Sequence, residues 1–178
     1  KDIGKIADVE RKVDFASLGG NTGLAHSRWA THGGVSKKNA HPHEDCKGRI
    51  SIVHNGIIEN HNELKAELQN KGHKFASDTD TEVIAHLIEE HYKGNLLEAT
   101  RKALQGIEGS YALGIIHADT PEKMVAARNE SPLIIGIGNK ENFIASDVPA
   151  ILPYTKKVIY LGNREIALLT KENVEVFD

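Results

Sequence analysis

Residues 27–46, SRWATHGGVSKKNAHPHEDC, concentrate side chains that could bind a metal or act as a nucleophile. This stretch holds the only tryptophan and the only cysteine of the chain, together with His32, His41 and His43. Imidazole and thiolate are preferred zinc ligands, so these three histidines and Cys46 could form the metal site of a zinc-dependent hydrolase. No second cysteine pair and no HExxH sequence accompanies them, which favours histidines that hydrogen-bond within a loop. We therefore predict no metal and keep the zinc hydrolase as an alternative.

Cys46 itself lies between Asp45 and Lys47 in a polar stretch. A reactive cysteine needs a lowered pKa, which a nearby cation, a helix N-terminus or a base provides. Lys47 is the only such group that the neighbouring residues supply, so we interpret Cys46 as an incidental surface cysteine.

The pair Asn55-Gly56, within VHNGIIEN, has two interpretations. This dipeptide is typical of a tight hairpin turn in which both residues take positive φ. An asparagine amide and a glycine N–H could instead form an oxyanion hole, which stabilises an oxygen that gains charge in a transition state. Because glycine also permits a close backbone approach, the two interpretations can coexist.

Three further residues could bind the charged ends of a free amino acid. The planar guanidinium of Arg28 could bind a carboxylate through two hydrogen bonds, and the hydroxyl of Thr31 could add a third. Asp80 precedes an apolar helix, so capping of that helix is its default interpretation, although its carboxylate could also bind an ammonium group. Amino-acid binding requires that the fold bring Arg28 and Asp80 together; otherwise Arg28 is an ordinary surface arginine.

The elements that must position these groups follow from apolar periodicity and from glycine, proline and asparagine breaks. Strands are predicted over residues 22–30 and 49–55, separated by a loop over 31–48. Helices are predicted over 60–72, 80–94 and 95–106, the first with Asn60 and Glu63 in capping-box spacing. The last two helices should pack together. Short strands follow at 110–118, 123–129, 132–138, 142–147, 157–162, 164–170 and 173–177.

This order of elements predicts an α+β fold in a single domain over residues 1–178. Short connections between strands favour antiparallel pairing, with helices on one face of a sheet that closes on itself or on a second sheet. A net charge of -3 and 5% aromatic residues argue against a nucleic-acid partner. No apolar stretch approaches the roughly 18 residues that span a bilayer, and one cysteine allows no internal disulfide, so a soluble, cytoplasmic protein is expected.

Several of these stretches together resemble one family. SRWATHG, NAHPH, VHNGIIEN, SDTDTEV, SPLIIG and ENFIASD occur in the order found in the glutaminase domain of the glutamine:fructose-6-phosphate amidotransferases, which are class II glutamine amidotransferases. The resemblance covers nearly the whole chain. It implies a four-layer αββα N-terminal-nucleophile hydrolase sandwich.

The resemblance also implies roles for the residues singled out above. The loop that starts at Arg28 would be a glutamine-binding lid, in which Arg28 and Thr31 hold the substrate carboxylate, His32 lies nearby and Trp29 helps to gate ammonia. Asp80 would bind the α-amino group of glutamine.

Further roles complete the implied site. Asn55 and Gly56 would form the oxyanion hole, and His41 would support the loop. No cofactor is implied. The family's nucleophile is a cysteine at the mature N-terminus, whose α-amine acts as the base. Because this chain starts at Lys1, we expect it to lack that cysteine and the first strands, and to be inactive as it stands.

The resemblance implies hydrolysis of L-glutamine to glutamate and ammonia. In a full-length enzyme the ammonia would convert fructose 6-phosphate to glucosamine 6-phosphate, an aminotransferase reaction of amino-sugar synthesis. Sugar-isomerase domains are expected downstream of residue 178, with a possible homodimer formed through them. A non-catalytic glutamine-binding module remains an alternative besides the zinc hydrolase.

Overall fold

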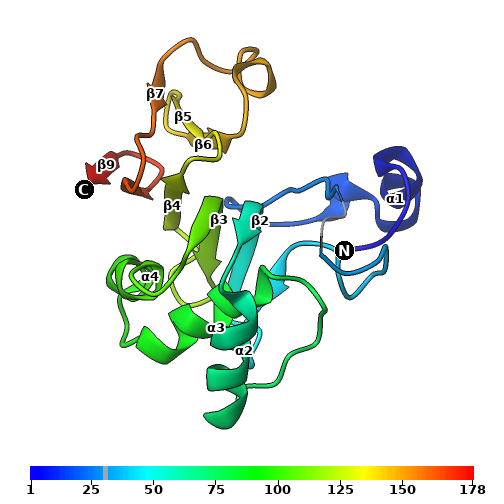
Figure 1. Cartoon of the computed structure of the whole chain (residues 1–178). Helices are drawn as coiled ribbons and strands as arrows, with labels where there is room; N and C mark the ends of the chain where they lie inside the picture. The colour runs from blue at the N-terminus through cyan, green and yellow to red at the C-terminus, as the bar shows by residue number, and fades with distance from the viewer. Residues whose placement is uncertain (30–31) are drawn as a thin grey trace.

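A six-stranded antiparallel sheet forms the centre of the computed structural model, which describes residues 1–29 and 32–178 (Figure 1). Its strand order is β1-β2-β3-β4-β8-β9. The long pair β2–β3 lies in register over nine residues of each strand, from Ile50 opposite His117 to Ile58 opposite Gly109. The strands are β1 (His43–Glu44), β2 (Ile50–Ile58), β3 (Gly109–His117), β4 (Met124–Asn129), β8 (Ile166–Leu169) and β9 (Val174–Phe177).

Three helices cover one face of this sheet: α2 (His61–Asn70), α3 (Glu82–His91) and α4 (Leu96–Leu104) (Figure 1). Alternate residues of the strands point toward them, so that Ile52 and Ile115 are fully buried against Ile84 and Ile88 of α3. The main core therefore lies between the helices and β2–β4. The three predicted helices, and the packing of the last two against one another, are confirmed.

The other face of the sheet carries a second, three-stranded sheet of order β6-β5-β7. Its strands are β5 (Ile134–Ile137), β6 (Asn142–Ala145) and β7 (Val158–Tyr160). Small residues on the first sheet, Ala112 and Ala126, let Ile135 and Leu161 pack closely between the sheets. The prediction of helices on one face and antiparallel strands after Gly109 is confirmed.

The outer face of the second sheet is covered by the segment that contains η2 (Val148–Ala150). A Cβ atom placed on Gly136 of β5 would lie 2.8 Å from Ile151 and 2.9 Å from Thr155. This contact puts that segment directly against the sheet. The order helices, sheet, sheet, covering segment corresponds to the expected αββα layers, with the last layer short.

The predicted capping box at the start of α2 is wrong. Asn60 makes no capping hydrogen bond to the helix. Its amide nitrogen instead donates to Gly106 O at 2.9 Å, and its Oδ1 accepts from Glu108 N at 3.1 Å. The side chain is therefore used to hold the turn that precedes β3, a role that the local sequence does not reveal.

The strand predicted over residues 22–30 is also wrong for the part that the structure describes, residues 22–29, which form no strand. The segment runs extended, with half-buried and exposed residues in alternation. Side chains rather than a backbone ladder hold it: Leu24 packs over Gly114 of β3, and His26 bonds to Asn55. The same alternation is typical of a strand, which explains why the sequence pattern predicted one here.

The first eighteen residues contain α1 (Ile6–Val13) and η1 (Phe15–Ser17), which the sequence analysis does not assign. Neither element buries a residue. Within the described residues, no helix is long and apolar enough to cross a membrane.

Candidate functional site

Asn55 and Gly56 lie within β2, not in a turn, so the hairpin interpretation is wrong. Gly56 has φ 131°, a value that other residues rarely adopt. A Cβ atom at this position would lie 2.1 Å from Ser110 O of β3. Glycine is required here because the two strands approach too closely for any side chain.

The open edge of β2 presents a row of backbone N–H groups. His54 N donates to Nδ1 of His41 at 3.2 Å, and Ile58 N donates to Oδ2 of Asp80 at 2.9 Å. Successive N–H groups of a strand point to opposite edges, so the N–H of Gly56 points to the same edge as those of His54 and Ile58. The β2 edge therefore carries a donor at Gly56, flanked by two donors that are already bound.

The side chain of Asn55 projects from the face of β2 that meets the second sheet. Its Oδ1 lies 2.8 Å from Nε2 of His26. The His26 ring stacks on His41 with 4.1 Å between ring centres. When His26 donates to Oδ1, the amide nitrogen of Asn55 is turned away from His26 and can donate elsewhere. Asn55 and Gly56 thus supply two donors on adjacent residues.

Asp80 does not cap α3. The N-cap residue is Thr81, whose side chain makes no capping bond. Asp80 is 3% exposed, and its Oδ1 lies 3.8 Å from Nδ1 of His32. A nearly buried carboxylate that binds one backbone N–H keeps acceptor capacity on its other oxygen. That oxygen faces the loop that begins at Arg28.

The Arg28 guanidinium forms hydrogen bonds to backbone carbonyl groups of this loop. It donates to Gly33 O at 3.0 Å and Gly34 O at 3.4 Å, and makes a short bond to His32 O. His32 thus accepts a bond from Arg28 through its backbone and faces Asp80 with its ring, although Nδ1 of His32 makes no hydrogen bond. Trp29 is 90% exposed, and Thr31 lies outside the described residues.

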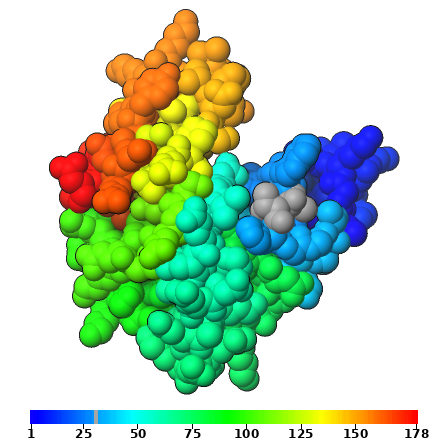
Figure 2. All heavy atoms as spheres, viewed as in Figure 1, coloured from blue at the N-terminus to red at the C-terminus, as the bar shows by residue number. Residues whose placement is uncertain are grey.

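Asn39 ties the same loop to the segment before α3. Its amide nitrogen donates to Gly34 O at 3.0 Å, and its Oδ1 accepts from Asp78 N at 2.9 Å. Gly33 lies so close that a Cβ there would meet the Asn39 amide at 2.8 Å. Sequence reasoning missed Asn39 and His26, although Asn39 begins the quoted motif NAHPH and His26 directly precedes SRWATHG. Figure 2 shows an indentation between the N-terminal segment (blue) and the second sheet (yellow to orange), with β2 (cyan) at its base.

Two histidines beneath this site are neutral. Burial lowers the pKa of His41 to about 2, with further lowering by His26 and His43. Burial also lowers the pKa of His43 to about 4, and its Nε2 lies 3.1 Å from the Thr79 hydroxyl. A neutral His41 has a free lone pair on Nδ1, which is the acceptor that the N–H of His54 needs. The supporting role predicted for His41 stays a prediction.

The zinc site predicted as an alternative is wrong in its ligand set. His41 and His43 bond to the β2 edge and to Thr79, and His32 faces Asp80. Cys46 instead gathers with three residues outside that set. Burial raises the pKa of the Cys46 thiol, which argues against a thiolate nucleophile.

Comparison with known proteins identifies the family of this chain. A family model described as a glutamine amidotransferase domain matches residues 26–153. The glutamine–fructose-6-phosphate aminotransferase [isomerizing] of Thermococcus kodakarensis is 57% identical over 178 residues, covering 99% of this chain and 30% of that protein. An enzyme of the same name from Thermus thermophilus is 52% identical, covering 100% of this chain and 29% of that protein.

The fold is similar to that of solved amidotransferases. The glutamine phosphoribosylpyrophosphate amidotransferase of B. subtilis superposes with a TM-score of 0.71 at 27% identity, over 85% of this chain and 33% of that chain. The chain belongs to the glutamine amidotransferase domain family and has the N-terminal-nucleophile hydrolase fold. It spans about 30% of the length of the curated relatives that it matches.

The neutral histidines predict a loss of stability in acid. Between pH 6.5 and about 4, histidines of the unfolded chain take up protons whereas His41 and His43 do not, so the free energy of unfolding falls as the pH falls. Each histidine contributes up to about 1.4 kcal/mol per pH unit. We expect His41→Asn, which keeps an acceptor for the His54 N–H, to flatten the slope measured by urea unfolding. The exposed His91→Asn is the control; an unchanged slope in His41→Asn would contradict the assignment.

The close approach at Gly56 predicts a specific cost for adding one methyl group. Gly56→Ala should lower the free energy of unfolding by about 1–3 kcal/mol more than Gly72→Ala. Gly72 is the matched control because it has φ 97° but nothing lies within 4 Å of an added Cβ. If both variants lost the same free energy of unfolding in urea, β2 and β3 would be able to move apart at Gly56 without a loss of stability.

Proposed function

We propose that this chain is the glutaminase part of an enzyme that hydrolyses L-glutamine to glutamate and ammonia. The observation that supports the proposal is that Asn55 and Gly56 are adjacent on β2, close to Ile58, whose N–H binds the buried carboxylate of Asp80. An oxyanion hole needs donors aimed at one oxygen, and an α-amino group needs a buried acceptor.

Glutamine would bind through both charged ends. The free oxygen of Asp80 would accept from its ammonium group, and Arg28 would donate to its carboxylate with help from Thr31. In the described conformation, Arg28 donates to carbonyls of the loop 32–34. Binding would therefore exchange these loop carbonyls for the substrate carboxylate and reshape the loop around it. His32 would stay between the two residues, and Trp29, which is 90% exposed, would be free to close over the site and gate ammonia.

The reaction would follow the chemistry of a terminal cysteine nucleophile. We propose that a segment upstream of Lys1 supplies this cysteine in the longer protein. Its thiol sulfur attacks the side-chain amide carbon, and its α-amine takes the thiol proton. Asn55 and Gly56 stabilise the oxygen that gains charge. The carbon–nitrogen bond breaks as that proton passes to nitrogen, ammonia leaves, and water then cleaves the thioester to release glutamate.

The names of the relatives support a use for the ammonia. They are called glutamine–fructose-6-phosphate aminotransferases, and the chain covers about 30% of their length. In the longer protein the ammonia would convert fructose 6-phosphate to glucosamine 6-phosphate on sugar-isomerase domains downstream. Those domains would also carry a homodimer interface, and the whole enzyme would work in the cytoplasm.

Ammonia release separates this proposal from its alternatives. We expect glutamine-dependent ammonia from a chain extended upstream to its natural N-terminal residue, and none from residues 1–178 alone. Turnover by the short chain would contradict a terminal nucleophile. A folded, extended chain that binds glutamine without turnover would favour the non-catalytic binding module instead.

The oxyanion assignment predicts a selective loss in the extended enzyme. Asn55→Ala should lower kcat about 10²- to 10³-fold, because one donor to the transition-state oxygen is lost, with little change in glutamine affinity. Asn62→Ala, an exposed asparagine on α2, should change neither quantity. The readouts are steady-state ammonia release and calorimetric glutamine binding. Near-normal turnover of Asn55→Ala would remove Asn55 from the mechanism.

A further inference from the structure

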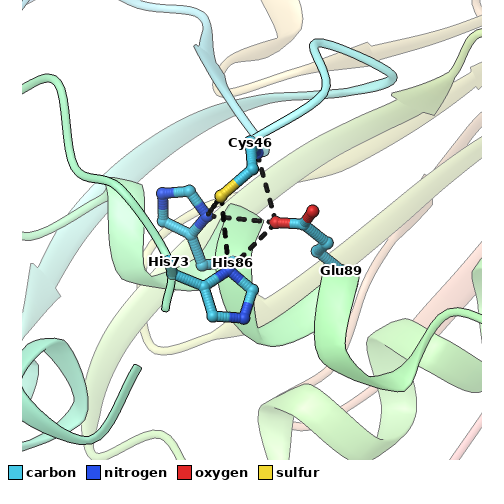
Figure 3. Close-up of side chains that lie close together, drawn as sticks. All are labelled: Cys46, His73, His86 and Glu89. Atoms are coloured by element: carbon cyan, nitrogen blue, oxygen red, sulfur yellow. Dashed lines mark hydrogen bonds and ion pairs between the residues drawn. The ribbon is translucent and has the colours of Figure 1, made fainter. Parts of the chain in front are cut away.

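Four potential metal ligands meet at a place that the glutaminase site does not use (Figure 3). Cys46 comes from the loop between β1 and β2, His73 follows α2, and His86 and Glu89 lie one turn apart on α3. One ligand atom from each residue lies within 4.8 Å of the other three. Three segments that are distant in sequence thus direct a thiol, two imidazoles and a carboxylate at one point.

Four of the six separations between these atoms lie close to those around a tetrahedral ion. Zinc bonds of about 2.3 Å to sulfur and about 2.0 Å to nitrogen or oxygen place neighbouring ligand atoms about 3.3–3.6 Å apart. Sγ of Cys46 lies 3.5 Å from Nδ1 of His73 and 3.6 Å from Nδ1 of His86. Oε2 of Glu89 lies 3.0 Å and 3.3 Å from the same two nitrogens. All four ligand atoms lie within 4.8 Å of one another, so small side-chain shifts would complete the tetrahedron.

The opposite nitrogen of each ring faces a further carboxylate. Nε2 of His73 lies 2.9 Å from Glu90 Oε1, and Nε2 of His86 lies 3.7 Å from Glu82 Oε1. Metal-bound histidines usually donate their other N–H to a carboxylate, which orients the ring. His73 has this arrangement. His86 Nε2 is buried without a hydrogen-bond partner, although the Glu82 carboxylate is the nearest acidic group. Both rings direct Nδ1 inward.

Proton counting argues for a cation between these groups. The His73 imidazole lies within hydrogen-bond distance of a carboxylate oxygen at both nitrogens, yet a neutral imidazole carries only one N–H. Without a metal, one nitrogen of a neutral His73 would direct a lone pair at a carboxylate. A divalent ion on the inner lone pairs of both rings leaves the outer N–H of His73 to Glu90, and its charge balances the Cys46 thiolate and Glu89.

We propose that this cluster is a structural Zn²⁺ site formed by Cys46, His73, His86 and Glu89. Sulfur with two imidazoles is a ligand set that favours zinc among the common divalent ions, and four protein ligands leave no open position for catalysis. His86 is 1% exposed, whereas Cys46 is exposed and borders a cleft of about 340 Å³ through which an ion can enter. The metal would link helix α3 to the loop that leads into β2. It would thereby stabilise the β2 edge from outside the active site.

Metal binding by residues 1–178, without an affinity tag and stripped with EDTA, tests the proposal independently of glutaminase activity. We expect about one equivalent of zinc by elemental analysis after dialysis. Cobalt should bind in its place with a sulfur-to-metal charge-transfer band in the near ultraviolet. Saturating zinc should raise the unfolding midpoint by roughly 5–10 °C.

Variants identify the ligands. Cys46→Ser should abolish the charge-transfer band, and Glu89→Gln should keep the band while weakening cobalt binding at least about 10-fold. The matched control is His91→Gln, because His91 is an exposed histidine at the end of the same helix, and it should bind like the unaltered chain. The proposal is overturned if the unaltered chain binds no stoichiometric zinc or cobalt, or if the band survives in Cys46→Ser. Circular dichroism of each variant shows that loss of binding is not loss of fold.

Discussion

The close contact of β2 with β3 at Gly56 is the constraint on which the rest of the site depends. One edge of β2 pairs with β3 along its whole length, and Gly56 lets the two backbones approach where a side chain would not fit. The other edge is paired only briefly with β1. Its N–H groups are therefore available to side-chain acceptors. His41 and Asp80 take the two donors on either side, which leaves the donor at Gly56 between them.

The loop after Arg28 is organised around this edge by polar contacts more than by apolar packing. Arg28 binds the loop carbonyls, Asn39 joins the loop to the segment before α3, and His32 faces Asp80 without a hydrogen bond from its Nδ1. Hydrogen bonds contribute about 1 kcal/mol each, because each replaces a bond to water. The position of this loop therefore depends on a few polar contacts rather than on a buried apolar core.

The buried histidines show how the same residue type serves opposite purposes in one small domain. His41, stacked on His26, is kept neutral by burial and acts as an acceptor for the backbone of β2. His73 and His86 instead both direct Nδ1 at Glu89, and His73 also bonds to Glu90 through Nε2, which is the arrangement on which the proposed zinc site rests. Local sequence does not separate the two groups, because the difference lies in the residues that surround each ring.

The sequence by itself determined the helices, most of the strands, the antiparallel arrangement and the family. Apolar periodicity and glycine breaks report on burial of neighbouring residues, and this information is local. The sequence also identified Arg28, Asn55, Gly56 and Asp80 as candidate site residues, because each has a side chain or backbone suited to a stated chemical role. Only the tertiary structure decided what these residues contact. Asn60 looked like a helix cap but binds the turn before β3, because its hydrogen-bond partners lie 46 and 48 residues away. Asn55-Gly56 looked like a turn but lies inside β2, because pairing with β3 overrides the local preference. Cys46 looked like an incidental surface cysteine, but the folding of α2 and α3 brings His73 and His86 to it. Contacts between residues far apart in sequence depend on the path of the whole chain, which no local pattern encodes.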